Sequence, residues 1–151
     1  MAFAPEVAKI LILQEQPTEK AALKRSLETR HELKFVSRAD DALLYLKDQN
    51  VDLVITRVHL DYGNLFSFLK ALKDDPQLSA TPVICFCGML SKCASVQHEF
   101  LMKATRIYGA TDYLALEHFC KGDDFNLELI CQSIERSLTA GNQDMQENSA
   151  N

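Results

Sequence analysis

The fold of this chain is decided by Val51-Asp-Leu-Val-Ile-Thr-Arg57-Val-His-Leu60. This short apolar run follows a break at Asn50 and turns polar where a buried strand would reach the surface. In open α/β sheets, binding and chemistry lie just beyond the carboxyl ends of the strands, because the loops there surround a crevice. We therefore predict a buried strand here, with Arg57 at its functional end.

Four other runs are short, apolar and bounded by polar or turn residues, as buried parallel strands are. Between them, apolar residues recur at helical spacing, most clearly at Leu65, Phe68, Leu69 and Leu72. This alternation predicts an α/β domain with a parallel sheet covered by helices on both faces. The predicted strands are Lys9–Leu13, Leu33–Val36, Asp52–Thr56, Pro82–Phe86 and Asp112–Leu116.

Capping residues predict where the helices begin. Pro17 and Thr18 suit the first turn of one helix, and Asp40 or Asp41 can cap the next. Gly63-Asn64 supplies a turn and a cap for the third helix.

Glycine and composition predict where the domain ends. The last helix, over Leu127–Leu138, is expected to stop at Gly141. The residues after it are polar and poor in apolar side chains, which is typical of disorder. We predict a domain over residues 1–140 and a disordered polar tail over residues 141–151.

Composition and charge exclude several classes of function. The 151 residues, 47% hydrophobic and 25% charged, fit one ordinary globular domain. A net charge of −5 disfavours direct nucleic-acid binding, and no apolar run approaches the length that spans a bilayer. The first residues lack the features of a signal peptide, and the five cysteines include no Cys-x-x-Cys pair. We expect a reduced, cytoplasmic location.

Five segments, in this order and spacing, resemble the response-regulator receiver domain of two-component signalling over roughly residues 8 to 140. The resemblance implies a flavodoxin-like (βα)₅ three-layer sandwich with strand order 2-1-3-4-5. The segments are Lys9-Ile-Leu-Ile-Leu-Gln-Glu-Gln-Pro17, Asp52-Leu-Val-Ile-Thr-Arg57, Lys73-Asp-Asp-Pro76, Thr81-Pro-Val-Ile84 and Gly109-Ala-Thr-Asp-Tyr-Leu114.

The same resemblance implies a phosphorylation pocket, and this chain departs from it at most positions. Receivers accept a phosphoryl group on an Asp at the end of their third strand. They hold Mg²⁺ with two acidic residues after the first strand, and they bind the phosphoryl oxygens with a Thr or Ser and a Lys. The acidic pair falls on Gln14 and Glu15, and the acceptor position falls on Arg57. The hydroxyl position falls on Cys87 and the Lys position on Leu116.

The departures predict that phosphorylation by the family route and Mg²⁺ binding are lost, so we expect no cofactor. A guanidinium is neither a nucleophile nor a ligand for a hard cation. Glu15 and Arg57 should instead face each other, and two readings stay open. The pair either plugs the pocket and fixes one conformation, or is a loose, solvated contact that contributes little free energy.

Further family features fall on the second half of the chain. Tyr113 lies at the switch aromatic, which turns inward in phosphorylated receivers; here it is either a switch or a structural tyrosine. The segment from Leu90 to Tyr108 is longer than the usual receiver needs, with helical spacing in its second half. It is either a partner surface that includes Phe100, Met102 and Tyr108, or an elongated helix.

Other reactive side chains offer weaker sites. Cys85, Cys87, Cys93 and His98 match no standard zinc spacing, so we predict no metal. Cys87 beside Arg57 is a candidate for an activated thiolate.

We therefore predict a non-catalytic, stand-alone pseudo-receiver that signals by phosphorylation-independent protein–protein interaction. Its partner would be a histidine kinase, another signalling protein or a second copy in a homodimer, with no nucleic acid and no membrane. One alternative is phosphorylation from a phosphodonor at an unconventional residue such as His59 or Asp61. Another is a redox- or anion-sensing domain that uses Cys87 and Arg57.

Overall fold

A computed structural model describes residues 7–59, 64–88, 95–122 and 124–150. Within these residues, one five-stranded parallel sheet has the order β2-β1-β3-β4-β5. This order confirms the predicted flavodoxin-like architecture. The strands are β1 (Lys9–Leu13), β2 (Glu32–Val36), β3 (Leu53–Arg57), β4 (Val83–Cys87) and β5 (Asp112–Ala115).

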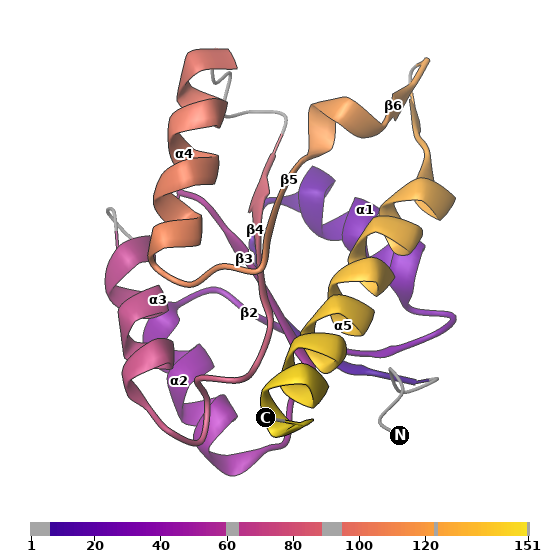
Figure 1. Ribbon diagram of the computed structural model, residues 1–151. Helices are drawn as coiled ribbons and strands as arrows, with labels where there is room; N and C mark the ends of the chain where they lie inside the picture. The colour runs from indigo at the N-terminus through magenta and orange to yellow at the C-terminus, as the bar shows by residue number, and fades with distance from the viewer. Residues whose placement is uncertain (1–6, 60–63, 89–94, 123, 151) are drawn as a thin grey trace.

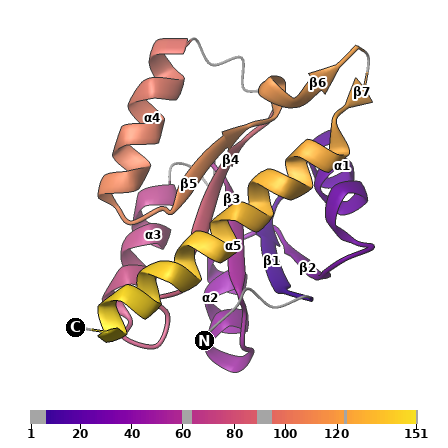
Figure 2. The ribbon, with the colours of Figure 1, turned by 45° about the vertical axis from the view of Figure 1, so that its right-hand side comes forward.

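The helices cover both faces of the sheet and complete a three-layer sandwich (Figure 1). Two helices, α1 and α5, pack side by side on one face, and α2, α3 and α4 cover the other (Figure 2). None of the helices in the described ranges is long and apolar enough to cross a bilayer. The helices are α1 (Pro17–Leu27), α2 (Ala39–Asp48), α3 (Leu65–Asp74), α4 (Ser95–Ile107) and α5 (Leu127–Ala150).

The strands are buried on both faces, which explains their continuous apolar sequences. On β1, Ile10 and Ile12 pack toward α1 and α5, while Leu11 and Leu13 pack toward α2 and α3. All four side chains are fully buried. The alternation follows from the two-residue period of a strand, and it divides the core into two clusters, one on each face of the sheet.

Several predicted boundaries are wrong by a short distance. Asp40 and Asp41 do not cap α2; they lie in its first turn, after an N-cap at Arg38. Asn64 does occupy the N-cap of α3, but its side chain makes no capping hydrogen bond. Gly63 lies outside the described residues.

The prediction that the last helix stops at Gly141 is also wrong, because α5 continues to Ala150. The residues after Gly141 include no proline and several good helix formers, so nothing in the sequence forbids further turns. Whether residues 141–151 form a separate tail stays a prediction.

The connection between β5 and α5 was not predicted. Leu116 does not extend the strand; it begins a 3₁₀ helix, η3 (Leu116–Phe119). A small antiparallel hairpin follows, formed by β6 (Cys120–Lys121) and β7 (Asp124–Phe125). Asn126 then caps α5, because its side-chain oxygen accepts a hydrogen bond of 3.1 Å from the Leu129 N–H.

Candidate functional site

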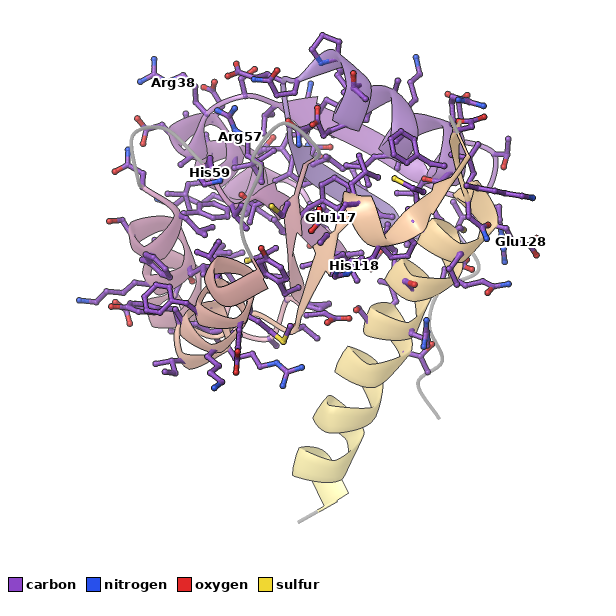
Figure 3. All side chains as sticks on the ribbon, turned by 90° about the horizontal axis from the view of Figure 1, so that it is seen from above. Arg38, Arg57, His59, Glu117, His118 and Glu128 are labelled. Atoms are coloured by element: carbon purple, nitrogen blue, oxygen red, sulfur yellow. The ribbon has the colours of Figure 1, made fainter. Side chains whose placement is uncertain are left out.

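The carboxyl ends of β1, β3 and β4 meet at one edge of the sheet, where a cavity of about 220 Å³ opens. Figure 3 looks onto this edge and shows Arg57 and His59 there. The cavity carries polar side chains from three segments and has an apolar floor. It is lined by Gln14, Gln16, Glu19, Arg57, Val58, His59, Phe86 and Gly88.

Arg57 ends β3 and reaches toward the loop after β1. Its Nη1 lies 2.9 Å from Oε1 of Glu15. The Arg57 side chain is 14% exposed and that of Glu15 is 50% exposed, so the pair lies at the rim of the cavity. The structure therefore brings together the two residues that the sequence placed opposite each other.

The side chain of Gln14 is hydrogen-bonded to the backbone of the residues that follow it. This side chain is buried, and its Oε1 accepts hydrogen bonds of 3.1 Å from the N–H groups of Glu15 and Gln16. Because both donors already engage this oxygen, it is poorly placed to bind a cation. With the guanidinium of Arg57 nearby, the described side chains at this edge are a poor fit for the Mg²⁺ that receivers hold, and the loss of Mg²⁺ binding stays a prediction.

Cys87 and Leu116 do not line the cavity. Cys87 is buried among the apolar residues under α2 and α3, with its Sγ 3.8 Å from the carbonyl oxygen of Gly88. Leu116 is fully buried on the opposite face, in the cluster that includes Ile130 of α5. The positions that bind the phosphoryl group in receivers are therefore part of the core here.

Tyr113 is also buried. It lies in the middle of β5, next to Cys85 of β4, and its ring belongs to the cluster under α2 and α3. The side chain thus has the inward position that the resemblance associates with phosphorylated receivers.

Glu19 is a charged cavity residue that sequence reasoning missed. It lies in the first turn of α1, where a glutamate is ordinarily exposed, yet it is only 2% exposed. Its Oε2 is buried and has no hydrogen-bond partner among the described residues. The only signal in the sequence is its place just after Pro17, which indicates a helix start but says nothing about burial.

Cys85 and Cys87 are poor redox centres. Burial raises the pKa of the Cys85 thiol to about 12, against an opposing hydrogen bond from Thr105. Cys87 is equally inaccessible, which counts against an activated thiolate at this position. Cys93 and the side chain of His98 lie outside what the structure describes, so the predicted absence of a zinc site there stays a prediction.

A second cluster joins His31, Cys131 and Glu135, whose ligand-type atoms lie within 4.8 Å of one another. The Ala8 N–H donates a 3.0 Å hydrogen bond to His31 Nδ1, so the ring proton is on Nε2, which lies 2.9 Å from Glu135. A metal on Nε2 would require the proton to move to Nδ1, facing that N–H donor. Burial and the charge of Glu135 also raise the pKa of the Cys131 thiol. The cluster therefore fits a structural link better than a metal site.

The predicted partner surface on α4 divides into separate parts. Phe100 and Ile107, seven residues apart, share one helix face and are 67% and 83% exposed. Met102 lies about 160° around the helix from Phe100, at about 100° per residue. Tyr108 packs against Phe66 of α3, with ring centroids 4.8 Å apart. Phe100 and Ile107 thus form the main exposed apolar stripe of α4.

No protein-family model and no curated protein sequence matches this chain. Solved structures match its fold. A putative response regulator from Chloroflexus aurantiacus J-10-fl is 19% identical, with a TM-score of 0.69 over 87% of this chain and 98% of that one. The chemotaxis response regulator CheY4 of Vibrio cholerae is 21% identical, with a TM-score of 0.66 and the same coverage.

The receiver domain of a signal transduction histidine kinase from Syntrophus aciditrophicus is 24% identical. Its TM-score is 0.66, over 89% of this chain and 92% of that chain. At these identities the comparisons establish the fold, which is that of response-regulator receiver domains.

Proposed function

We propose that this chain is a pseudo-receiver, a module of two-component-type signalling that acts by binding another protein and accepts no phosphoryl group. The observation that carries the proposal is Arg57, paired with Glu15 at the end of β3. A phosphoacceptor must be a nucleophile whose charge a metal offsets. A guanidinium supplies neither property.

The remaining positions support the same proposal. Leu116 is in the core and cannot offer a cation to a phosphoryl oxygen, and Cys87 is a weak hydrogen-bonding group in an apolar cluster. Tyr113 already points inward. We infer that the domain holds one conformation, so its signal depends on whether the partner is present and not on a phosphorylation switch.

The stripe formed by Phe100 and Ile107 is the surface we propose for the partner. Large apolar side chains exposed together on a helix are typical of interaction sites. A signalling protein such as a histidine kinase is the proposed partner, and a second copy of the chain is the alternative.

Incubation with acetyl phosphate and Mg²⁺, followed by intact-mass measurement, tests the first half of the proposal. A phosphorylatable receiver treated in parallel shows that the reagent is active. We expect this protein to keep its mass. A stable gain of one phosphoryl group would overturn the proposal and favour an unconventional acceptor.

The second half is tested by partner capture from lysates of the host, comparing wild type with Phe100→Asp/Ile107→Asp. The matched control is Leu44→Asp, since Leu44 is 66% exposed on α2, away from the stripe. We expect the double variant to lose about tenfold or more in partner affinity and the control to retain it. Equal retention by both variants would exclude this surface. Sedimentation velocity of the purified protein identifies a homodimer if the partner is a second copy.

A further inference from the structure

The carboxylate of Glu19 is held inside the cavity by a close backbone contact. A methyl group built on Gly88 would lie 2.3 Å from Glu19 Oε1 and 2.6 Å from its Cγ, so only glycine allows this approach. The usual role of a glutamate in the first turn is to accept the N-cap N–H. That N–H, from Gln16, donates instead to Gln14. The carboxylate therefore has no local role in capping.

Among the described residues, Glu19 is the cavity carboxylate that makes no ion pair. The described ion pair of Arg57 is with Glu15, so it joins one positive and one negative charge. Glu19 adds a second negative charge, with a buried Oε2 that lacks a hydrogen-bond partner in the described part of the chain. A buried carboxylate oxygen without a hydrogen-bond partner is costly, and the amino end of α1 offsets only a part of that cost. The site is therefore complementary to a group that supplies one positive charge and N–H donors.

The chemistry of the cavity selects among cations. A divalent metal needs several oxygen ligands, but Gln14 Oε1 is already engaged by two backbone donors. Arg57 also repels a divalent ion more strongly than a monovalent one, because the repulsion scales with the charge. An anion would meet the unpaired charge of Glu19. An organic monocation suits both the single carboxylate and the apolar floor made by Val58 and Phe86. A cavity of about 220 Å³ is ample, since about 150 Å³ holds a benzene molecule.

We propose that this cavity binds an organic monocation, with a primary ammonium or guanidinium group on Glu19 and its carbon stem against Val58 and Phe86. The cation comes either from a small amine or from a lysine or arginine side chain of another protein. The proposal goes beyond the interaction role and does not depend on it, because binding of a free amine needs neither the α4 surface nor a partner.

An amide-detected NMR titration of the full chain with n-butylammonium chloride tests the proposal. We expect saturable shifts at the amides of Gln16 and Gly88. Tetramethylammonium chloride, which carries the charge but no N–H donor, should bind at least several-fold more weakly. A parallel titration with Nα-acetyl-lysine methylamide distinguishes the sources. Tighter binding of this probe indicates a protein side chain, and tighter binding of butylammonium indicates a free amine.

Two variants make the titration specific. Glu19→Gln keeps the shape and removes the charge, so butylammonium affinity should fall about tenfold or more, with no loss of melting temperature. Glu28→Gln, at the exposed C-cap of the same helix, is the matched control and should bind like wild type. Gly88→Ala, whose methyl displaces Glu19, should also lose affinity. Absence of saturable shifts with either amine, or unchanged affinity in Glu19→Gln, would overturn the proposal.

Discussion

Arg57 and Glu15 form an ion pair of 2.9 Å that joins the carboxyl ends of β3 and β1, and only the arginine is largely buried. This asymmetry bears on the two readings of the pair. A fully buried pair would leave an uncompensated charge when one partner is removed, at a cost of several kcal/mol. A half-exposed glutamate lets water replace the lost partner, so the contribution of the contact itself must be modest.

A double-mutant cycle on this pair measures that contribution. We expect Arg57→Ala and Glu15→Ala to couple by about 0.5–1 kcal/mol in urea denaturation, the range of a partly exposed contact. Arg57→Ala alone should cost more than the coupling, because it also removes the packing of the arginine stem. Zero coupling would remove the plug reading and leave only a solvated contact.

Replacing Leu116 with the lysine that receivers carry at this position should destabilise the domain. Leu116→Lys places an ammonium in the core beside α5, where it cannot reach the cavity, so we expect a loss of about 3 kcal/mol or more in unfolding free energy. Leu116→Met, which conserves volume and polarity, is the control and should cost less than about 1.5 kcal/mol. Chemical denaturation of both variants gives the comparison. Near-wild-type stability for Leu116→Lys would mean that this position does open toward the cavity.

The strands were predictable because burial on both faces leaves a continuous apolar signature. In β4, for example, Val83 to Cys87 contains no polar interruption. Strand ends were less predictable, because in the sequence an apolar residue beyond the last hydrogen bond of the strand looks the same as one inside the strand. The sequence therefore predicts that Leu116 extends β5, although it starts η3. The hairpin of two-residue strands that follows has no periodicity to detect, and only Gly122, with φ of 63°, signals its turn.

The candidate site was predictable only where the family pattern supplied positions. Arg57 and Glu15 were placed together because parallel strands end at a common edge. Glu19 was missed because its burial depends on the bare backbone of Gly88, distant in sequence. His31 was missed for a similar reason, because its partners come from residues 8 and 135 and no local spacing connects them.

The link made by His31 should contribute strongly to stability. His31→Ala leaves the fully buried Ala8 N–H without its acceptor and Glu135 with Arg30 as its remaining described side-chain partner, so we expect a loss of about 1–3 kcal/mol. Glu135→Gln keeps an acceptor for His31 Nε2 and should cost less, although it weakens the 3.2 Å contact with Arg30. Urea denaturation compares the two variants. A larger cost for Glu135→Gln would show that the ion pair with Arg30 dominates this cluster.

Cys85 should make the protein sensitive to alkaline pH. Burial raises the pKa of its thiol from an ordinary value of 9.0 to about 12, so the folded state keeps the proton that the unfolded chain releases. The unfolded state then binds fewer protons, and stability falls as pH rises. Below pH 9 the stabilisation is complete, and between pH 9 and 12 the loss approaches about 1.4 kcal/mol per pH unit.

Other groups titrate in the same range, so the difference between wild type and Cys85→Ala isolates this thiol. At pH 7 the variant should be less stable, because it leaves a cavity under α2 and α3. The gap should narrow from pH 9 upward, since only wild type loses the thiol contribution. Denaturation midpoints at a series of pH values give the test. A gap that stays constant from pH 7 to 11 would show that the Cys85 thiol ionises in the folded protein as easily as in the unfolded chain.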